Sequence, residues 1–248
     1  RAVLGQVRDI ESLAKSATTG LTGTLRLGTT PTLGPYLLSP IIADLHRSAP
    51  GLRLYVQEGI PDAQTLALSR GDLDIVLGPM PIAGDDLEIE PLMREPLYLV
   101  SAVDDVLATG RPVTPAALEG RALLSLDPRH NLHRQAVMIA TRHRMSLMHD
   151  YEGTSLDSLH QMVASGLGLS VLPALYLASD VGGSAGLAIL DVVGWREHRS
   201  IALARRRGSS IGAAFGVIAE QLLGSAQRLL APASPPVSPA DPFRSASP

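Results

Sequence analysis

Hydroxyl side chains at the starts of predicted helices are the residues in this sequence best suited to bind a ligand. Five such residues stand in two places: Thr29, Thr30 and Thr32 in the first, and Thr154 and Ser155 in the second. The first backbone N–H groups of a helix have no partner within the helix, so these ends attract anions and polar groups. The pattern predicts binding of a small polar or anionic molecule. Ordinary helix capping is the alternative for each residue taken singly.

Several more specific chemistries lack support. His130 and His133 are three residues apart, but neither a cysteine nor an HExxH motif accompanies them, which disfavours a metal site. No GxSxG motif indicates a hydrolase, and the single lysine, Lys15, disfavours Schiff-base chemistry. The run Arg205–Arg207 is more typical of a solvated strand end than of a phosphate contact. We therefore expect no catalytic activity, no metal and no cofactor.

The stretch 154–173 indicates how these residues are positioned. Leu156, Leu159 and Val163 recur at helical spacing, and Ser155 precedes them in the usual position of an N-cap. Gly166 then ends the helix, as a residue that tolerates a left-handed conformation does. The letters LSVLP follow as a short buried strand. The sequence thus predicts a helix over 155–165, a glycine turn and a strand over 169–173.

The first third of the chain alternates strands with helices. Strands are predicted over 24–28, 52–59 and 74–78, and helices over 33–47 and 62–70. Strand–helix–strand alternation of this kind implies a parallel sheet with right-handed crossovers. Further along, the alternation continues through strands at 97–102, 122–126, 147–152, 187–192 and 200–205 and helices at 131–143 and 211–230. The fold class is therefore α/β.

Four segments resemble a known family in their order and spacing. GTLRLGTTPTLGPYLLSPII, GDLDIVLGP, EPLYLVSA and the 154–173 stretch are similar to the effector-binding domain of LysR-type transcriptional regulators, over about residues 20–223. Within that family, TPTLGPYLLSP, GTSLDSLHQMV and LPALY most resemble the OxyR-type, peroxide-sensing branch. The resemblance implies two Rossmann-like lobes joined by two crossover strands. This is the fold of type 2 periplasmic binding proteins, with a ligand cleft between the lobes.

The chain departs from that branch at its reactive centre. The branch has a peroxide-reactive cysteine in the context HCLRDQ, where this chain reads His130-Asn131-Leu132-His133-Arg134-Gln135. The resolving cysteine, nine residues later, corresponds to Ala140, and the whole chain contains no cysteine. A threonine that helps to hold peroxide in the branch is kept as Thr32, while its partner aligns with Pro61. Thiol-based peroxide sensing is therefore excluded for these residues.

The predicted cleft collects the candidate effector-binding residues. The loop 127–131 leads into a helix whose free amides favour an anion, and Arg199 is positioned to pair with a carboxylate. The full predicted set is Thr29, Thr30, Thr32, Pro61, Ser101, His130, Asn131, Thr154, Ser155 and Arg199.

The resemblance and the composition together give a domain plan. Residues 1–20 carry a narrow apolar seam and are predicted to form a linker helix, the end of a missing winged helix-turn-helix region. The first lobe comprises 21–100 plus 205–230, and the second 101–204. Residues 231–248 are rich in proline and are predicted to be disordered.

The function implied is that of a ligand-sensing regulatory domain. The formal net charge of −3 gives no electrostatic footprint for nucleic acid, so DNA binding is expected only through the missing N-terminal region. No apolar run is long enough to span a membrane, and a cytoplasmic location is expected. The family implies a homodimer in which 33–47 and 52–58 face the partner's 155–165, a tetramer of the full-length protein, and RNA polymerase as a candidate partner. A free-standing solute-binding protein and a ligand-independent oligomerisation domain remain the alternatives.

Overall fold

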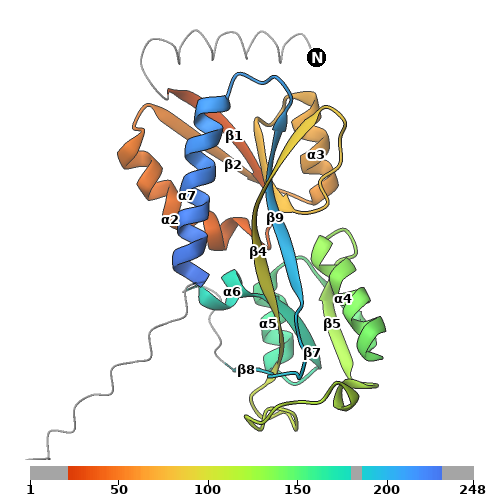
Figure 1. Cartoon of the computed structure of the whole chain (residues 1–248). Helices are drawn as coiled ribbons and strands as arrows, with labels where there is room; N and C mark the ends of the chain where they lie inside the picture. Colours follow the sequence, from red (N-terminus) through yellow and green to blue (C-terminus); the bar gives the residue numbers. More distant parts are fainter. Residues whose placement is uncertain (1–21, 180–185, 231–248) are drawn as a thin grey trace, which may run out of the picture.

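The computed structural model describes residues 22–179 and 186–230, which form two α/β lobes one above the other (Figure 1). The first lobe contains β1 (Gly23–Thr29), α2 (Gly34–Ser48), β2 (Leu52–Glu58), α3 (Pro61–Arg70), β3 (Ile75–Pro79) and α7 (Gly212–Leu230). The second contains a 3-10 helix (Pro115–Leu118), β5 (Ala122–Leu126), α4 (Asn131–His143), β6 (Ser146–Gly153), α5 (Leu156–Ala164), β7 (Leu169–Pro173), α6 (Ala174–Ala178) and β8 (Leu187–Ile189). The strands β4 (Leu87–Ala102) and β9 (His198–Arg206) run between the lobes.

One continuous path of paired strands joins the lobes. Its order is β2-β1-β3-β9-β4-β7-β5-β6, with β8 added beside β4. Within each lobe the strands next to the helices are parallel, as in the pairs β1–β2, β1–β3, β5–β6 and β5–β7. The strands β4 and β9 pair antiparallel with each other and with their neighbours. The predicted α/β class, with two lobes joined by two crossover strands, is confirmed.

The crossover pair is the mechanical link between the lobes. Its register runs from Leu87 opposite Arg206 to Pro96 opposite His198, with an irregularity between Pro91 and Met93. Glu95 lies directly opposite Arg199, close to the point where the ribbon enters the second lobe. A two-stranded connection of this kind lets two rigid lobes change their relative angle through small backbone changes.

Helices cover both faces of the first lobe's sheet. α2 and α7 pack together on one face, where Leu37 and Ile41 of α2 and Leu222 of α7 are fully buried. α3 covers the other face, above a smaller apolar cluster that consists of Leu68, Leu73, Val76, Ile82, Leu87, Ala202 and Ala204. Burial of a leucine or isoleucine side chain contributes about 1.5–3 kcal/mol to folding. The predicted apolar stripe of 33–47 is therefore a core-forming face.

Two differences between the predicted and observed elements have a physical explanation. β4 begins at Leu87, ten residues before the predicted strand at 97–102, although Pro91 and Pro96 lie within it. In the first lobe this part of β4 pairs only with β9, so it is an edge strand, where proline is tolerated. The short helix α6 was not predicted. α5 agrees with the prediction: Ser155 is its N-cap and Gly166 has a φ of +80°.

Two predicted segments fall outside the described residues. These are the linker helix at 1–20 and the proline-rich tail at 231–248. Among the helices that the structure describes, none is both long and apolar enough to cross a membrane.

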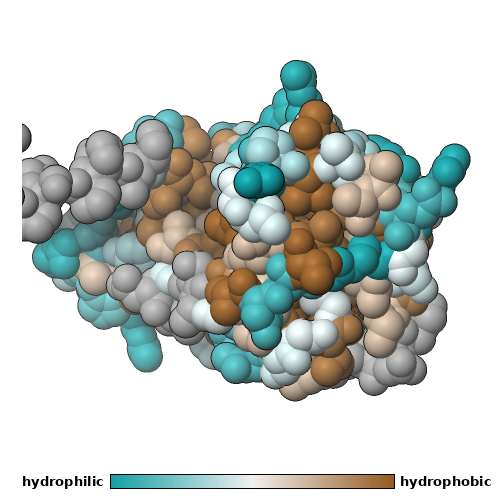
Figure 2. Space-filling model, turned by 90° about the horizontal axis from the view of Figure 1, so that it is seen from below, coloured by the Kyte–Doolittle hydropathy of each residue, from teal (hydrophilic) through white to brown (hydrophobic). Residues whose placement is uncertain are grey.

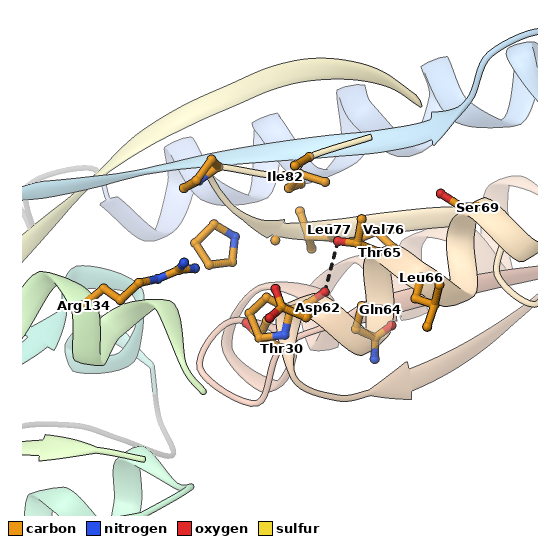
Figure 3. A pocket seen from close by; sticks show the side chains of 15 residues that line it. Thr30, Asp62, Gln64, Thr65, Leu66, Ser69, Val76, Leu77, Ile82 and Arg134 are labelled. Carbon is orange, nitrogen blue, oxygen red and sulfur yellow. Dashed lines mark hydrogen bonds between the residues drawn. The ribbon is translucent and has the colours of Figure 1, made fainter. Parts of the chain in front are cut away.

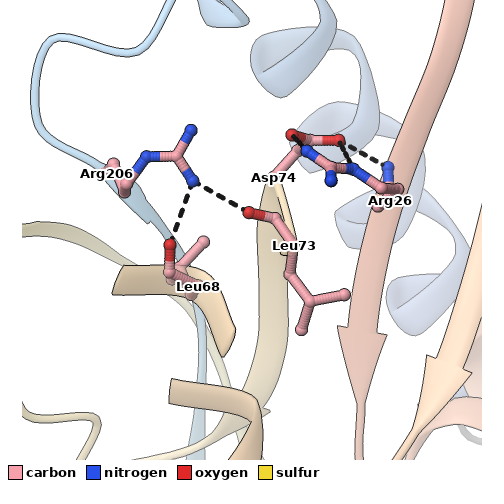
Figure 4. Close-up of polar contacts among 5 residues, drawn as sticks. All are labelled: Arg26, Leu68, Leu73, Asp74 and Arg206. Atoms are coloured by element: carbon pink, nitrogen blue, oxygen red, sulfur yellow. Dashed lines mark hydrogen bonds and ion pairs between the residues drawn. The ribbon is translucent and has the colours of Figure 1, made fainter. Parts of the chain in front are cut away.

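Arginines anchor α3 and β3 at the far end of the first lobe (Figure 4). Nη1 of Arg206 donates hydrogen bonds to the carbonyl oxygens of Leu68 and Leu73, at 3.0 Å each. On the neighbouring strand, Arg26 forms an ion pair with Asp74 at 2.7 Å. Arg206, in the middle of the arginine run noted in the sequence, thus has an internal structural role: it satisfies one carbonyl group in the last turn of α3 and one in the segment that leads to β3.

The far end of the second lobe exposes apolar side chains. Figure 2, the view from below, shows apolar atoms grouped among polar ones on this end. Val103, Val106 and Val193 belong to the segments that follow β4 and β8 there, and they are 60%, 78% and 55% exposed. More than half of each of these three residues is therefore open to solvent.

Candidate functional site

A pocket of about 360 Å³ lies between the lobes (Figure 3). Its first wall is one side of α3, from Pro61 to Ser69. Its second wall is the end of β3 and the loop that follows, from Val76 to Ala83. Thr30 and, from the second lobe, Arg134 of α4 complete the lining. Small-molecule sites in proteins commonly have volumes of about 300–1,000 Å³. The volume therefore suits a small organic ligand.

Two of the ten predicted site residues, Thr30 and Pro61, line this pocket. Two more are one contact away. The Oγ1 atoms of Thr30 and Thr32 are hydrogen-bonded at 3.2 Å, and Nδ2 of Asn131 donates to the carbonyl oxygen of Pro79, which is a lining residue. Thr30 and Thr32 precede α2, and Pro61 and Asn131 are the first residues of α3 and α4. The structure therefore brings three predicted helix starts together around one space.

Arg199 is at the centre of a buried network behind the threonines. It is 1% exposed, and its Nε donates to Oε2 of Glu95 at 2.7 Å. Nη1 donates to Oγ1 of Thr32 at 3.0 Å, and Nη2 donates to the carbonyl oxygen of Thr32 at 2.8 Å. Oε1 of Glu95 accepts from the backbone N–H of Leu175 at 2.9 Å. The carboxylate beside Arg199 therefore belongs to the chain itself, and the network joins the first lobe to α6.

Asn131 connects the two lobes directly. It is the first residue of α4, it is 6% exposed, and its Nδ2 lies 2.9 Å from the carbonyl oxygen of Pro79 at the end of β3. Its Oδ1 is buried and has no hydrogen-bond partner among the described residues. The side chain thus makes a hydrogen bond across the cleft and leaves an acceptor free.

His130, at the N-cap of α4, is buried, and its side chain makes no capping hydrogen bond. Burial lowers the pKa of His130 below its ordinary value of 6.5. The negative charge of Asp127 raises this pKa, and the positive charge of Arg129 lowers it further. Asp127 itself pairs with Arg129, whose hydrogen bonds hold the pKa of that carboxyl far below its usual range. The loop before α4 therefore presents a neutral imidazole and an anion that already has a partner.

The other predicted residues are not brought to the pocket lining. Oγ of Ser155 accepts from the backbone N–H of Asp157 at 3.2 Å, which is capping, and Thr154 is exposed. Ser101 is buried within β4 and donates to the carbonyl oxygen of Ala102. Thr29 is buried, and its Oγ1 has no partner among the described residues.

Among the lining side chains that sequence reasoning missed are the two ionisable ones, Asp62 and Arg134. Asp62 is in the first turn of α3, next to the predicted Pro61. Arg134 is three residues after Asn131 on α4, and positions three apart share one face of a helix. The helical spacing from Asn131 would have identified Arg134. Nothing local distinguishes Asp62 from the other exposed acidic residues.

A second contact between the lobes is aromatic. The rings of Tyr36 on α2 and Tyr176 on α6 meet edge to face with centroids 5.0 Å apart. The hydroxyl of Tyr176 donates to Oδ1 of Asp157 at 3.2 Å and is hydrogen-bonded to Nδ1 of His160. Burial, followed by the charge of Asp157, raises the pKa of both tyrosines, so both hydroxyls stay protonated. Ring pairs of this geometry contribute about 0.5–1.5 kcal/mol beyond area burial.

The chemistry of the site is that of binding. In the parts of the chain that the structure describes, no group of three His, Asp or Glu side chains could hold a metal ion. The pocket combines hydroxyl groups, one carboxylate and one guanidinium with the apolar side chains of Leu66, Val76 and Ile82. An apolar wall with a few placed polar groups is typical of small-molecule recognition.

Comparisons with known proteins show which family this chain resembles. A family model described as the LysR substrate binding domain matches residues 18–227. The DNA-binding transcriptional dual regulator OxyR of Escherichia coli (strain K12) is 31% identical over 222 residues, which cover 90% of this chain and 72% of that protein.

Two solved structures show the same fold. One is a cysteine-to-serine mutant of Corynebacterium glutamicum OxyR with hydrogen peroxide bound, with a TM-score of 0.80, 27% identity, and coverage of 92% of this chain and 72% of that one. The other is the reduced form of the OxyR regulatory domain from Pseudomonas aeruginosa, with a TM-score of 0.73, 28% identity, and coverage of 83% and 97%.

Proposed function

The chain belongs to the family of LysR substrate-binding domains, and from this premise we propose that it is the ligand-sensing regulatory domain of a LysR-type transcription factor. The observation that carries the proposal is the pocket between the lobes, which is lined by α3, by β3 and the loop that follows it, by Thr30, and by Arg134 of α4. Its effector is a small polar or charged molecule, and the domain itself is not an enzyme.

We further propose that this domain senses its effector without thiol chemistry. The 248 residues contain no cysteine, so no sulfenic acid or disulfide can form within them. Asn131 stands where the OxyR-type pattern has its reactive cysteine, and it uses its amide to hydrogen-bond Pro79. An amide is not oxidised by peroxide in this way. Reversible binding in the pocket is the route to a signal that we propose.

The signal is a shift between lobe arrangements. A ligand that contacts α3 and β3 of the first lobe and α4 of the second binds best when the lobes are at one particular distance. It therefore shifts the equilibrium by its difference in affinity for the two arrangements, and by no more than that. The ribbon of β4 and β9 is the element that bends.

The domain organisation expected from the sequence extends to the rest of the protein. We propose that 1–20 is the linker helix from a winged helix-turn-helix region, that 21–100 with 205–230 and 101–204 are the two lobes, and that 231–248 is a disordered tail. DNA is bound through the N-terminal region, in the cytoplasm, by a tetramer that also contacts RNA polymerase.

A small-molecule panel tests the sensing function. We expect that at least one small polar or charged metabolite raises the midpoint of thermal unfolding in a saturable manner, because a ligand present at 100 times its Kd stabilises the folded state by about 2.7 kcal/mol. Ala83→Phe places a ring in the pocket from an exposed lining position and should abolish the shift.

The matched control is Ala116→Phe, at an exposed alanine outside the pocket, which should leave the shift unchanged. Stabilisation that survives Ala83→Phe would place the binding elsewhere.

Dimerisation is proposed through the outer faces of α2 and β2 against α5 of a partner. β2 is an edge strand, and Arg53 and Tyr55 on it are exposed. The double substitution Arg53→Glu with Tyr55→Glu should weaken the dimer at least tenfold, because it places two carboxylates in a desolvated contact. Sedimentation at several protein concentrations measures the change. An unaltered dimer would refute this assignment.

A ligand-independent domain is the second candidate, and a specific observation favours it. The Asn131–Pro79 hydrogen bond and the Tyr36–Tyr176 contact already join the lobes through the chain's own side chains. In that case no compound in the panel shifts the unfolding midpoint.

A further inference from the structure

The pocket contains one charge of each sign, on opposite lobes. Among the described residues that line it, the ionisable ones are Asp62 at the start of α3 and Arg134 on α4. In Figure 3 the guanidinium of Arg134 extends from α4 toward the first-lobe wall, where Asp62 lies. The two charges therefore face the same space from its two sides.

Neither charge has a partner within the described part of the chain. No hydrogen bond or ion pair is formed there by Asp62 or Arg134. Three other arginines of the molecule are paired: Arg26 with Asp74, Arg199 with Glu95 and Arg205 with Glu88. Both side chains are exposed in the open pocket, where water solvates them. A ligand that displaces this water must replace its interactions.

Several of the side chains that line the pocket are apolar. Leu66 on α3, Val76 on β3 and Ile82 in the following loop line it, together with Pro79 and Pro81. The hydroxyl of Thr65, which also lines the pocket, already donates to the carbonyl oxygen of Pro61 at 3.0 Å (Figure 3). The apolar part of the lining therefore suits methylene groups better than a polar chain.

We propose that the effector is a small zwitterion whose ammonium group pairs with Asp62, whose carboxylate pairs with Arg134, and whose apolar body lies against the apolar side chains of the same pocket. The inference rests on the proposed sensing function and specifies the ligand class of the same pocket. A volume of about 360 Å³ accommodates on the order of ten non-hydrogen atoms, since a water molecule takes up about 30 Å³.

Opposite charges on opposite lobes also explain how such a ligand would act. A carboxylate held by a guanidinium forms a directional, two-point contact, and an ammonium–carboxylate pair forms at the other end. Both contacts are satisfied together only at one lobe separation. A ligand with a single charge satisfies one lobe and leaves the charge on the other lobe desolvated without a partner.

Calorimetric titration of the whole chain with ω-amino acids tests the inference. The probes are the series from 3-aminopropanoate to 6-aminohexanoate, which varies the separation of the two charges. Hexanoate and hexylamine, with one charge each, are the matched comparison compounds. We expect that at least one ω-amino acid binds roughly tenfold or more tightly than either of them, since each charged contact contributes about a factor of ten.

Two neutral variants separate the contacts. Asp62→Asn should remove the advantage of the ω-amino acid over hexanoate, and Arg134→Gln should remove its advantage over hexylamine. Asp72→Asn and Arg111→Gln are the controls, because both side chains are exposed and neither lines the pocket. They should leave every affinity unchanged. All four positions are exposed, so the variants are expected to fold.

The possible outcomes are distinct. If hexanoate or another single anion binds as tightly as the ω-amino acids, the zwitterion inference is overturned while the sensing function stands. If no ω-amino acid binds, the inference is also overturned, and the metabolite panel decides the sensing function independently. Binding that both Asp62→Asn and Arg134→Gln leave unchanged would place the ligand outside these two charges and overturn the inference as well.

Discussion

Replacing Arg199 by methionine is expected to lower the free energy of unfolding by about 3–5 kcal/mol, the largest loss that any single substitution in the site should cause. The reason is that Arg199 is fully buried and holds the equally buried Glu95 at 2.7 Å. Without the guanidinium, Glu95 is a buried carboxylate with no cation beside it. The carbonyl and hydroxyl groups of Thr32 lose their donors at the same time.

Urea unfolding of the variant and the parent chain measures the loss. The double substitution Arg199→Met with Glu95→Leu is the control, because it removes the stranded charge together with its partner. It should recover a substantial part of the lost stability, since a buried ion pair replaced by apolar side chains often costs little. A loss below about 1 kcal/mol for Arg199→Met alone would contradict the network described above.

The second large loss of stability is expected from the substitution Asn131→Asp at neutral pH. The aspartate has the same shape, but its carboxylate cannot donate to the carbonyl oxygen of Pro79, which Nδ2 of Asn131 contacts at 2.9 Å. It also places a charge at a position that is 6% exposed. We expect the free energy of unfolding to fall by about 2–5 kcal/mol and the link between the lobes to break. Amide hydrogen exchange at the end of β3 should become faster.

The pH dependence of the stability shows whether the new charge at position 131 causes the loss in Asn131→Asp. Burial and the facing carbonyl group raise the pKa of the new carboxyl in the folded state, so the folded variant is favoured at low pH and loses stability as the pH rises through that value. A protonated carboxyl can also donate to Pro79. The parent chain has the opposite trend near His130, whose folded pKa is lowered by burial. The contribution of His130 to the free energy of unfolding is complete above about pH 6.5 and is lost as the pH falls below that value.

Chemical denaturation at several pH values measures both trends. Asn131→Ser, which is smaller and uncharged, is the control and should show no gain of stability in acid relative to the parent chain. If Asn131→Asp and Asn131→Ser had parallel pH profiles, the charge at position 131 would not be the cause.

The fold was largely predictable because its signals are local. The apolar stripe of α2, the alternation of β1 and the cap and glycine turn around α5 each lie within about 20 residues. The first half of β4 was missed because Pro91 and Pro96 argue against a strand. Whether a strand tolerates proline depends on whether it lies at an edge, and the sheet order alone decides that.

The site was predictable only in part, because a pocket is made by segments far apart in the chain. Helix-start residues were the right kind of candidate, and Thr30 and Pro61 indeed line the pocket. The sequence cannot tell a helix start that faces the pocket from one that only caps a helix, as Ser155 does. Asp62 and Arg134, the two lining charges, are 72 positions apart and look like ordinary surface residues.

The sequence by itself determined that this is an α/β protein of the LysR substrate-binding family and that its 248 residues contain no thiol. Those properties depend on residue types and on short-range periodicity. Only the tertiary structure decided the partner of Arg199, the contact of Asn131 with Pro79 and the meeting of Asp62 with Arg134 at one pocket. These contacts depend on how β4 and β9 position the two lobes relative to each other. Burial and charge pairing follow from distances in space and not from separations along the chain.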